Sequence, residues 1–276
     1  MLTVDPTAHR PKKSLGQHFL KDRSVPPRIA QAAQLEPDDF VLEIGPGLGV
    51  LTEELAQRLD PQRGRLLAVE LDNTLLPHLE DRFAPHPHVS FLHADVLDVD
   101  PATLTEGRPY KLVANLPYYI TSAILRHFLE TEARPTSMTV MVQREVAERM
   151  VARPPEMSLL AVAVQFYGQP KIVFRVPPGA FNPPPNVDSA VVHITVYQPG
   201  ERPAVVASEA AFFKVAQAGF GQRRKQLANT LAASLNLPKE QVVAQLTHSG
   251  IDPTRRAQTL TLQEWATITT VLNPEE

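Results

Sequence analysis

The chain has no cysteine among its 276 residues. This absence excludes a disulfide framework, a thiolate metal site and a cysteine nucleophile. The sequence also lacks any run of about 18 apolar residues, which a membrane-spanning helix would need. Its N-terminus has no apolar core of the kind found in signal peptides. We therefore expect a cytoplasmic protein that does not contact membranes. The nine histidines are scattered along the chain, and we expect no metal site.

A positive net charge is missing as well, because the formal charge at pH 7 is −3. The overall field of the protein therefore does not favour nucleic acid, and any binding to RNA must come from local basic clusters. With 43% hydrophobic and 21% charged residues, the composition is that of an ordinary globular protein. The length suits one large domain, or one large domain with a small companion.

Four short stretches have the apolar pattern of buried strands, and each is followed by residues that can bind a ligand. They are residues 40–44 before the glycine turn with Gly45 and Gly47, 64–69 before Glu70, 89–94 before Asp95, and 111–114 before Asn115. In open α/β sheets, ligands bind where the carboxyl ends of the parallel strands meet. The sequence therefore predicts a doubly wound α/β domain with one ligand site at this edge.

The glycine turn and the acids after it indicate the class of ligand. Glycines let the main chain approach a ligand closely. Glu70 is placed to accept hydrogen bonds from the two hydroxyls of a ribose, and Asp95 can accept one from an adenine amino group. Because Glu43 stands beside the glycines, the rim is acidic and suits a cation better than a pyrophosphate. This favours S-adenosylmethionine, with its sulfonium and ammonium. An NAD-dependent oxidoreductase with the same turn remains an alternative.

The motif Asn115-Leu116-Pro117-Tyr118 follows the fourth of these strands. The Asn115 carboxamide and the carbonyl of Leu116 or Pro117 can accept both hydrogens of an exocyclic amine, while the Tyr118 ring can stack on a base. The same four residues can also form a simple Asx turn. Phe181 lies in a loop stiffened by three prolines, which suits a second aromatic wall for the base. Its alternative role is to fill the core.

A polar stretch at 198–203, rich in Pro and Gly, predicts a domain boundary. We expect a first domain at 1–199, with a basic N-terminal leader, and a helical domain at 200–276 with helices near 208–218, 224–234, 238–249 and 262–272. Two basic clusters in the second domain are candidates for contacts with RNA phosphates, which position a protein without reading sequence. They are Arg223, Arg224 and Lys225, and Arg255 and Arg256. A charged cluster can also be no more than a solvated face.

In this order, the motifs closely resemble the ribosomal RNA adenine N6,N6-dimethyltransferases of the KsgA type. The resemblance covers roughly residues 12–272. Besides the motifs above it includes Leu15-Gly-Gln-His-Phe-Leu20, Val69-Glu-Leu-Asp72, the loop at 181–190 and Arg256-Ala-Gln-Thr-Leu260. It implies a Rossmann-like class I methyltransferase domain with a small all-helical C-terminal domain. It also implies cofactor contacts from His18, Leu20, Gly45, Glu70, Asp95 and Asn115, although the family usually has Asn where this chain has His18.

The resemblance further implies the reaction and its partner. In that family S-adenosylmethionine donates methyl groups to two adjacent adenosines in the loop of the 3′-terminal hairpin of small-subunit rRNA. Some relatives modify large-subunit rRNA, but the basic cluster near 223 and the loop at 181–190 point to the small-subunit branch. The expected partner is the immature small ribosomal subunit, the expected oligomeric state is a monomer, and a role in ribosome biogenesis follows. An assembly factor for which methylation is secondary remains a further interpretation.

Overall fold

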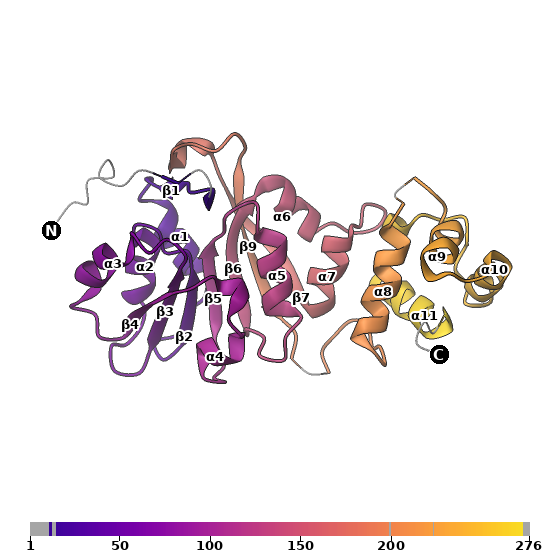
Figure 1. Cartoon of the computed structure of the whole chain (residues 1–276), viewed down its shortest axis with the longest axis horizontal. Helices are drawn as coiled ribbons and strands as arrows, with labels where there is room; N and C mark the ends of the chain where they lie inside the picture. Colours follow the sequence, from indigo (N-terminus) through magenta and orange to yellow (C-terminus); the bar gives the residue numbers. More distant parts are fainter. Residues whose placement is uncertain (1–10, 13–14, 199, 223, 273–276) are drawn as a thin grey trace. The chain divides into compact units, whose positions relative to one another are not determined.

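A seven-stranded sheet forms the centre of the first part of the chain in this computed structural model (Figure 1). The structure describes residues 11–12, 15–198, 200–222 and 224–272. Along the sheet the strands are β4 (Val89–His93), β3 (Arg65–Glu70), β2 (Phe40–Ile44), β5 (Lys111–Asn115), β6 (Ser137–Gln143), β9 (Ser189–Val196) and β7 (Gly168–Val176). The first five are parallel, and β9 is antiparallel to β6. The predicted α/β class with a Rossmann-like domain is confirmed.

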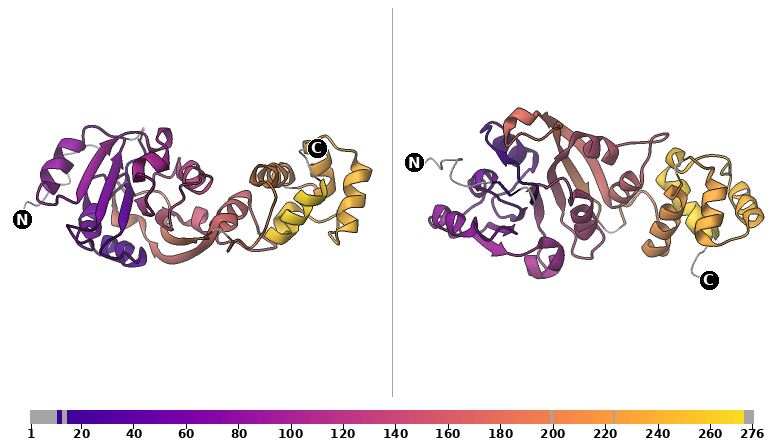
Figure 2. Two further views of the ribbon diagram at one scale, coloured as in Figure 1. Left: turned by 90° about the horizontal axis from the view of Figure 1, so that it is seen from below. Right: turned by 45° about the horizontal axis from the view of Figure 1, so that its top comes forward.

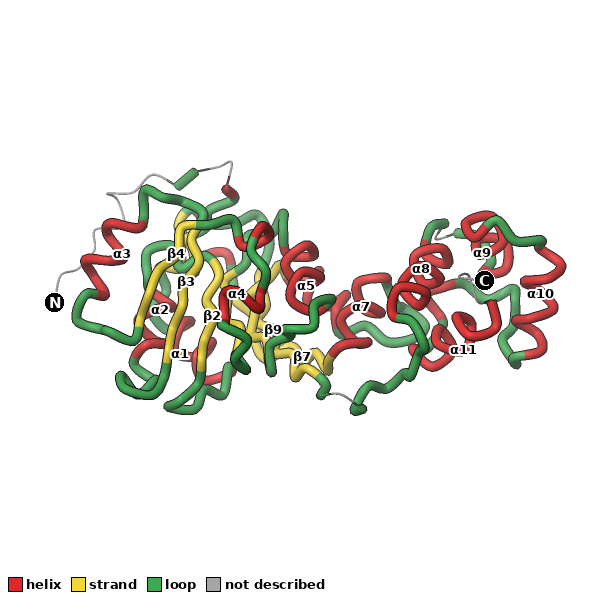
Figure 3. The backbone as a smooth tube through the Cα atoms, turned by 60° about the horizontal axis from the view of Figure 1, so that its bottom comes forward, coloured by secondary structure: helices red, strands yellow, loops and turns green. Residues whose placement is uncertain are grey.

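Helices cover both faces of this sheet (Figures 2 and 3). One face carries α1 (Val25–Ala32) and α2 (Val50–Ala56), and the other carries α4 (Pro101–Thr105) and α5 (Thr121–Leu129). The central strands are therefore buried on both sides, and Leu42, Leu112 and Val140 are all 0% exposed. Parallel strands with two covered faces read as continuous apolar runs, which is why the sequence pattern located them.

Two helices of the first unit share the same start signal. They are α3 (Leu76–Phe83) and α4, both of which have a proline in the first turn. The start of α4 carries a recognisable signal, because the Asp100 side chain accepts a hydrogen bond from Ala102 N and Pro101 follows the cap. A further helix, α6 (Arg144–Met150), follows β6 directly.

A two-stranded ribbon attaches the N-terminal segment to this unit. Its strands are β1 (Phe19–Leu20) and β8 (Phe181–Asn182), which pair antiparallel with Leu20 opposite Phe181. The amides of Lys21 and Asp22 continue the pairing by donating to the carbonyl of Ala180, at 2.9 and 3.2 Å. The ribbon fixes residues 15–20 close to the carboxyl ends of the sheet strands, where they form a wall of the cavity described below.

The second unit is helical. Its helices are α7 (Leu159–Tyr167), α8 (Glu209–Phe220), α9 (Leu227–Leu235), α10 (Lys239–His248) and α11 (Leu262–Leu272). Trp265 on α11 is fully buried in this unit. Gly219 lets α8 pack closely against the Trp265 indole, because a Cβ at position 219 would lie 2.3 Å from that ring. No helix in the described part of the chain is long and apolar enough to cross a membrane.

The two units are not contiguous in sequence. The first comprises the chain up to Ala147 together with Lys171–Val196, and the second comprises Glu148–Pro170 and the chain from Tyr197 onward. The third crossing between the units, after Val196, therefore lies three residues before the expected boundary at 199. The excursion at 148–170, which includes α7, belongs with the C-terminal helices. Division into two functional domains at 199 and 200 stays a prediction.

Candidate active site

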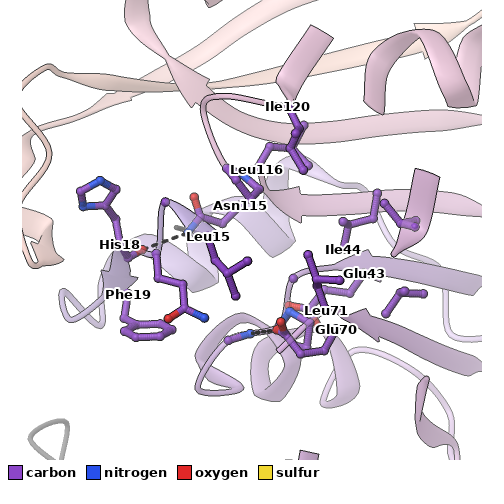
Figure 4. Close-up of a pocket in the computed structure, with 18 of the residues that line it drawn as sticks. Leu15, His18, Phe19, Glu43, Ile44, Glu70, Leu71, Asn115, Leu116 and Ile120 are labelled. Atoms are coloured by element: carbon purple, nitrogen blue, oxygen red, sulfur yellow. Dashed lines mark hydrogen bonds between the residues drawn. The ribbon is translucent and has the colours of Figure 1, made fainter. Parts of the chain in front are cut away.

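A cavity opens at the carboxyl ends of β2, β3 and β5, and residues 15–20 close it on one side (Figure 4). It contains about 1090 Å³ of empty space, including solvent at its mouth. The residues predicted to bind the cofactor and the target base line this cavity, with the exception of Phe181. They are His18, Leu20, Gly45, Gly47, Glu70, Asp95, Asn115, Leu116, Pro117 and Tyr118.

The glycine turn and Glu70 are joined by a hydrogen bond. The Glu70 carboxylate, 6% exposed, accepts from Gly47 N at 3.1 Å and from Asp72 N at 2.8 Å. Burial raises the pKa of Glu70, although these two hydrogen bonds act in the opposite direction. Gly45 has φ of +66°, and a Cβ on it would meet no atom within 4 Å. The main chain at this turn is therefore bare toward the cavity.

Glu43, which the sequence suggested only as part of an acidic rim, is a buried member of the cavity wall. Its side chain is 1% exposed, and its Oε2 has no hydrogen-bond partner among the described residues. Burial raises the pKa of Glu43 to about 8, the nearby Glu70 adds to the rise, and the adjacent Thr52 hydroxyl opposes it. Glu43 therefore keeps its proton to a higher pH than an ordinary glutamate does.

A buried carboxylate anchors the N-terminal wall of the cavity. Asp72 accepts from Lys12 Nζ at 2.6 Å, from Gln17 Nε2 at 2.9 Å and from Thr74 Oγ1 at 2.6 Å. Its own N–H is the group that donates to Glu70. Asp72 thus connects the cavity-lining Gln17 to the acid at the end of β3. Asp72 also closes an Asx turn, because its Oδ1 accepts from Thr74 N at 3.1 Å.

Asn115 ends β5 with its carboxamide oriented by the N-terminal segment (Figure 4). Asn115 Nδ2 donates to the carbonyl oxygen of His18 at 3.5 Å, which leaves Oδ1 to accept from a ligand. The carbonyl of Pro117 accepts from Thr121 Oγ1 at 3.1 Å and from Ile120 N at 3.3 Å. The Leu116 carbonyl is therefore a better candidate than the Pro117 carbonyl to accept a hydrogen bond from an exocyclic amine.

Tyr118 is half-buried, and its ring is held by one contact at the hydroxyl and one on the ring face. Its hydroxyl lies 2.6 Å from Ser189 Oγ on β9, and burial raises its pKa. The His18 imidazole stacks on the ring with centroids 5.8 Å apart and planes inclined by 26°. His18 Nδ1 lies 2.8 Å from the Pro183 carbonyl oxygen, so that nitrogen carries a hydrogen in this contact.

The structure corrects the expectation for Phe181. Its side chain is 1% exposed and packs in the core with Leu20, Val176 and Ala180. The pairing of β1 with β8 places Phe181 directly opposite Leu20, and both side chains pack in this core cluster. Phe181 fills the core in this structure instead of forming a wall for a base.

The two predicted RNA-binding clusters differ in their surroundings. Arg224 and Lys225 are exposed and precede α9, which begins at Leu227 and not near 224 as expected. Arg223 lies outside the described residues. Arg256 is exposed, whereas the Arg255 guanidinium donates to the Glu264 carboxylate and to the carbonyl and hydroxyl of Thr259. Arg255 is therefore committed to contacts within its own unit.

The cavity suits a cationic ligand with hydroxyl groups. No Lys or Arg stands among the described residues that line it, whereas Glu43, Glu70 and Asp95 all do. A glycine turn beside Glu70 and Asp95 would repel a pyrophosphate, but it matches a sulfonium, an ammonium and a ribose. These residues fit S-adenosylmethionine.

The chain is similar to curated methyltransferases over nearly its whole length. The ribosomal RNA small subunit methyltransferase A of Dehalococcoides mccartyi (strain ATCC BAA-2266 / KCTC 15142 / 195) is 53% identical over 257 residues, covering 93% of this chain and 86% of the relative. The protein of the same name from Pelotomaculum thermopropionicum is 46% identical, with 94% of this chain and 90% of the relative covered.

Solved structures extend this similarity. The 23S rRNA methyltransferase ErmE has a TM-score of 0.72 at 29% identity, with 92% of this chain and 99% of that chain covered. A dimethyladenosine transferase from Plasmodium falciparum, at 22% identity, shares the fold with a TM-score of 0.79 over 93% and 98% of the two chains. The family model described as ribosomal RNA adenine dimethylase matches residues 8–274. The chain belongs to this family and is a methyltransferase.

Proposed function

We propose that this chain transfers methyl groups from S-adenosylmethionine to the N6 amino groups of two adjacent adenosines in the loop of the 3′-terminal hairpin of small-subunit rRNA. One observation carries the proposal: Asn115 and Tyr118 share a cavity with Glu70 and Asp95. Acceptors for an amino group and acids for a cationic methyl donor therefore face the same space. The names of the curated relatives support the choice of the small subunit.

The acidic end of the cavity is assigned to the cofactor. Glu70 would accept from the ribose hydroxyls, Asp95 from the adenine amino group, and Glu43 would face the positively charged end. The main chain at Gly45 allows close approach, because a Cβ there would meet no atom within 4 Å. When bound, S-adenosylmethionine supplies an electrophilic methyl group on its sulfonium. The acids and the glycine turn would hold the cofactor in the cavity that Asn115 also lines.

The acceptor end is assigned to the target amine. An adenine N6 is a weak nucleophile because its lone pair is delocalised into the ring. Hydrogen bonds from its two hydrogens to Asn115 Oδ1 and the Leu116 carbonyl would favour a more tetrahedral nitrogen with a localised lone pair. The nitrogen becomes acidic only after it has gained the methyl group, so the site needs no strong general base. Orientation and electrostatics are the protein's contributions.

The target base must leave its stack to enter the cavity. The ring of Tyr118, held at its hydroxyl by Ser189, offers a fixed face on which the base can stack. A base that stacks on the side now covered by His18 must separate the two rings, whose centroids are 5.8 Å apart. A second methylation of the same nitrogen requires the cavity to readmit the monomethylated base.

Contacts with the ribosomal particle are assigned to the helical unit. We retain Arg224, Lys225 and Arg256 as phosphate contacts because all three are exposed, and we omit Arg255 because its guanidinium is engaged internally. Phosphate contacts of this kind would dock the chain on the immature small subunit without reading its sequence. We propose that the chain acts as a cytoplasmic monomer during subunit biogenesis.

A labelling experiment tests the proposed function. The full chain is incubated with S-adenosylmethionine carrying a labelled methyl group and, in separate reactions, with unmethylated small subunits, unmethylated large subunits and DNA. We expect label only in small-subunit rRNA, as N6,N6-dimethyladenosine at two adjacent positions of the 3′-terminal hairpin loop. Label in large-subunit rRNA or DNA, or a product other than dimethyladenosine, would contradict the assignment.

A further inference from the structure

Tyr119 is an aromatic side chain exposed at the mouth of the cavity. It lines the cavity next to Tyr118, yet its exposed fraction is 60%. Its hydroxyl has no hydrogen-bond partner among the described residues. Among the residues that the structure describes, the other exposed large hydrophobic side chains are aliphatic, namely Leu71, Leu92, Val173, Val187 and Val205. A lone exposed ring beside the base-binding motif therefore calls for an explanation beyond packing.

The Tyr119 ring packs against the main chain of Gly16. Gly16 has φ of +59°, and a Cβ on it would lie 3.2 Å from Tyr119 Cδ1. The residue at position 16 thus needs both a conformation that favours glycine and the space that only glycine leaves. One edge of the Tyr119 ring packs against Gly16, while most of the side chain remains exposed to solvent. The ring is positioned and yet uncovered.

We propose that Tyr119 is a stacking platform for the nucleobase that neighbours the target adenosine. The inference rests on the proposed function. If Tyr118 holds the target base inside the cavity, the next nucleotide of the strand must lie just outside it, where Tyr119 is exposed. No Lys or Arg among the described residues lines this cavity, so the wall does not offer the strand a contact for its phosphates.

Stacking is the interaction that this wall does offer. Bases in single-stranded loops are unstacked from a helix and commonly bind proteins through aromatic rings. Such stacking tolerates any base, because every base has a π-face. Tyr119 would therefore hold the strand at the mouth while the adjacent adenosine occupies the cavity. It would do so without changing the electrostatic part of RNA binding.

Two other roles for Tyr119 predict different behaviour. An exposed tyrosine with no function can be replaced without consequence. A tyrosine that only supports the N-terminal wall through Gly16 would matter for the shape of the cavity, and its loss would weaken cofactor binding. The stacking role predicts a loss in methyl transfer to RNA with unchanged affinity for the cofactor.

The test compares Tyr119→Ala, Tyr119→Leu and Tyr119→Phe in the full chain, using unmethylated small subunits in single-turnover methyl transfer with saturating cofactor. We expect transfer efficiency to fall about tenfold for Ala and Leu, which lack an aromatic face, and to stay within about twofold of the wild type for Phe. The salt dependence of subunit binding should not change, because no charge is removed. Leu92→Ala, at an exposed aliphatic residue of β4 outside the cavity, is the matched control and should behave as wild type.

The outcomes separate this inference from the function on which it rests. Wild-type efficiency in Tyr119→Ala, or an equal loss in Tyr119→Phe, would overturn the stacking role. Weaker S-adenosylmethionine binding by Tyr119→Ala in calorimetry would overturn it in favour of wall support. If the wild-type chain does not methylate small subunits, the proposed function fails and this inference falls with it. If the wild type does and Tyr119→Ala matches it, only this inference fails.

Discussion

The side-chain amide nitrogen of Asn115 lies 3.5 Å from the backbone carbonyl oxygen of His18, a residue 97 positions earlier in the chain. A carbonyl oxygen only accepts hydrogen bonds, so the carboxamide must turn its N–H toward His18. Its Oδ1 is then available to the target amine. The contact uses a main-chain atom, so this orientation does not require the Asn that the family usually has at position 18. The base-binding motif is thus oriented by the N-terminal wall of the cavity.

Asn115→Ala should lower the rate of single-turnover methyl transfer by about 10²–10³, a usual effect of removing an oriented electrostatic group. Binding of small subunits should remain nearly intact, because Asn115 lines the cavity and none of the proposed phosphate contacts does. The rate is measured with saturating subunits and cofactor. A rate within a few-fold of the wild type would mean that the motif is only a turn and that the proposed mechanism is wrong.

Asp72→Asn should detach the N-terminal wall and weaken S-adenosylmethionine binding by about tenfold. Burial alone would raise the pKa of Asp72, but hydrogen bonds from Lys12, Thr74 and Gln17 outweigh it and hold the pKa well below its usual range. The stabilisation is therefore complete at neutral pH and is lost only as the pH falls below about 4. Calorimetry at pH 7 measures the cofactor affinity.

Lys12→Met provides the control for this prediction, because it removes the ion pair at 2.6 Å but keeps the bond between Gln17 and Asp72. Its effect should be smaller than that of Asp72→Asn and should diminish at high salt, since the Lys12 side chain is 40% exposed. Equal cofactor affinity in the wild type and Asp72→Asn would show that the wall holds its position without this carboxylate.

The sequence predicted the ends of the sheet strands well, because each of these strands is a short apolar run followed by a turn or a polar residue. Glu70, Asp95 and Asn115 could be predicted to lie together for that reason alone. Phe181 could not be assigned correctly, since the two-residue ribbon that contains it pairs segments about 160 positions apart. Short pairings of this kind leave no periodic pattern in the sequence.

Other members of the site could not be predicted because their roles depend on contacts between distant segments. Asp72 acts through Lys12 and Gln17, and neither pairing has a signature in the sequence. In the helical unit, Arg255 and Arg256 read as one basic cluster. The structure separates them, because only Arg255 lies within reach of Glu264 on α11.

Glu43 should make the stability of the free protein depend on pH. Its pKa of about 8 lies above its ordinary value of 4.5, so between these values the folded chain keeps a proton that the unfolded chain has lost. The free energy of unfolding therefore falls as the pH rises through this window, by up to about 1.4 kcal/mol per pH unit. Glu43→Gln cannot ionise and should lack this decline. Denaturant unfolding of both proteins from pH 5 to pH 9 measures it.

The control for this prediction is the same titration in the presence of S-adenosylmethionine. A cation beside Glu43 favours the ionised carboxylate. The cofactor should therefore reduce the fall of the free energy of unfolding with pH in the wild type. Below pH 8, the protein should also release a proton when the cofactor binds. Calorimetry in buffers with different ionisation enthalpies detects that proton. If the free energies of unfolding of the wild type and Glu43→Gln change in the same way with pH in the absence of cofactor, Glu43 does not cause the pH dependence.

Arg255 and Arg256 should have opposite phenotypes although they are adjacent. Arg255 binds both oxygens of Glu264, and Glu264 in turn caps the start of α11 by accepting from Thr261 N at 2.7 Å. Arg255→Ala would break a bidentate, partly buried pair and weaken this cap. We expect it to lower the free energy of unfolding by about 1–3 kcal/mol, measured by denaturant titration, without changing the salt dependence of subunit binding.

Arg256→Ala should instead leave the free energy of unfolding within about 0.5 kcal/mol of the wild type, because the side chain is exposed. If Arg256 contacts a phosphate, the slope of log affinity for small subunits against log salt should fall by about 1, and the double variant of Arg224 and Lys225 should lower it by about 2. Cofactor affinity should not change in either variant, since none of these residues lines the cavity. An unaltered slope in the Arg256 variant and in the double variant would mean that Arg224, Lys225 and Arg256 do not contact phosphates. A reduced slope in Arg255→Ala at full stability would mean that RNA competes with Glu264 for that guanidinium.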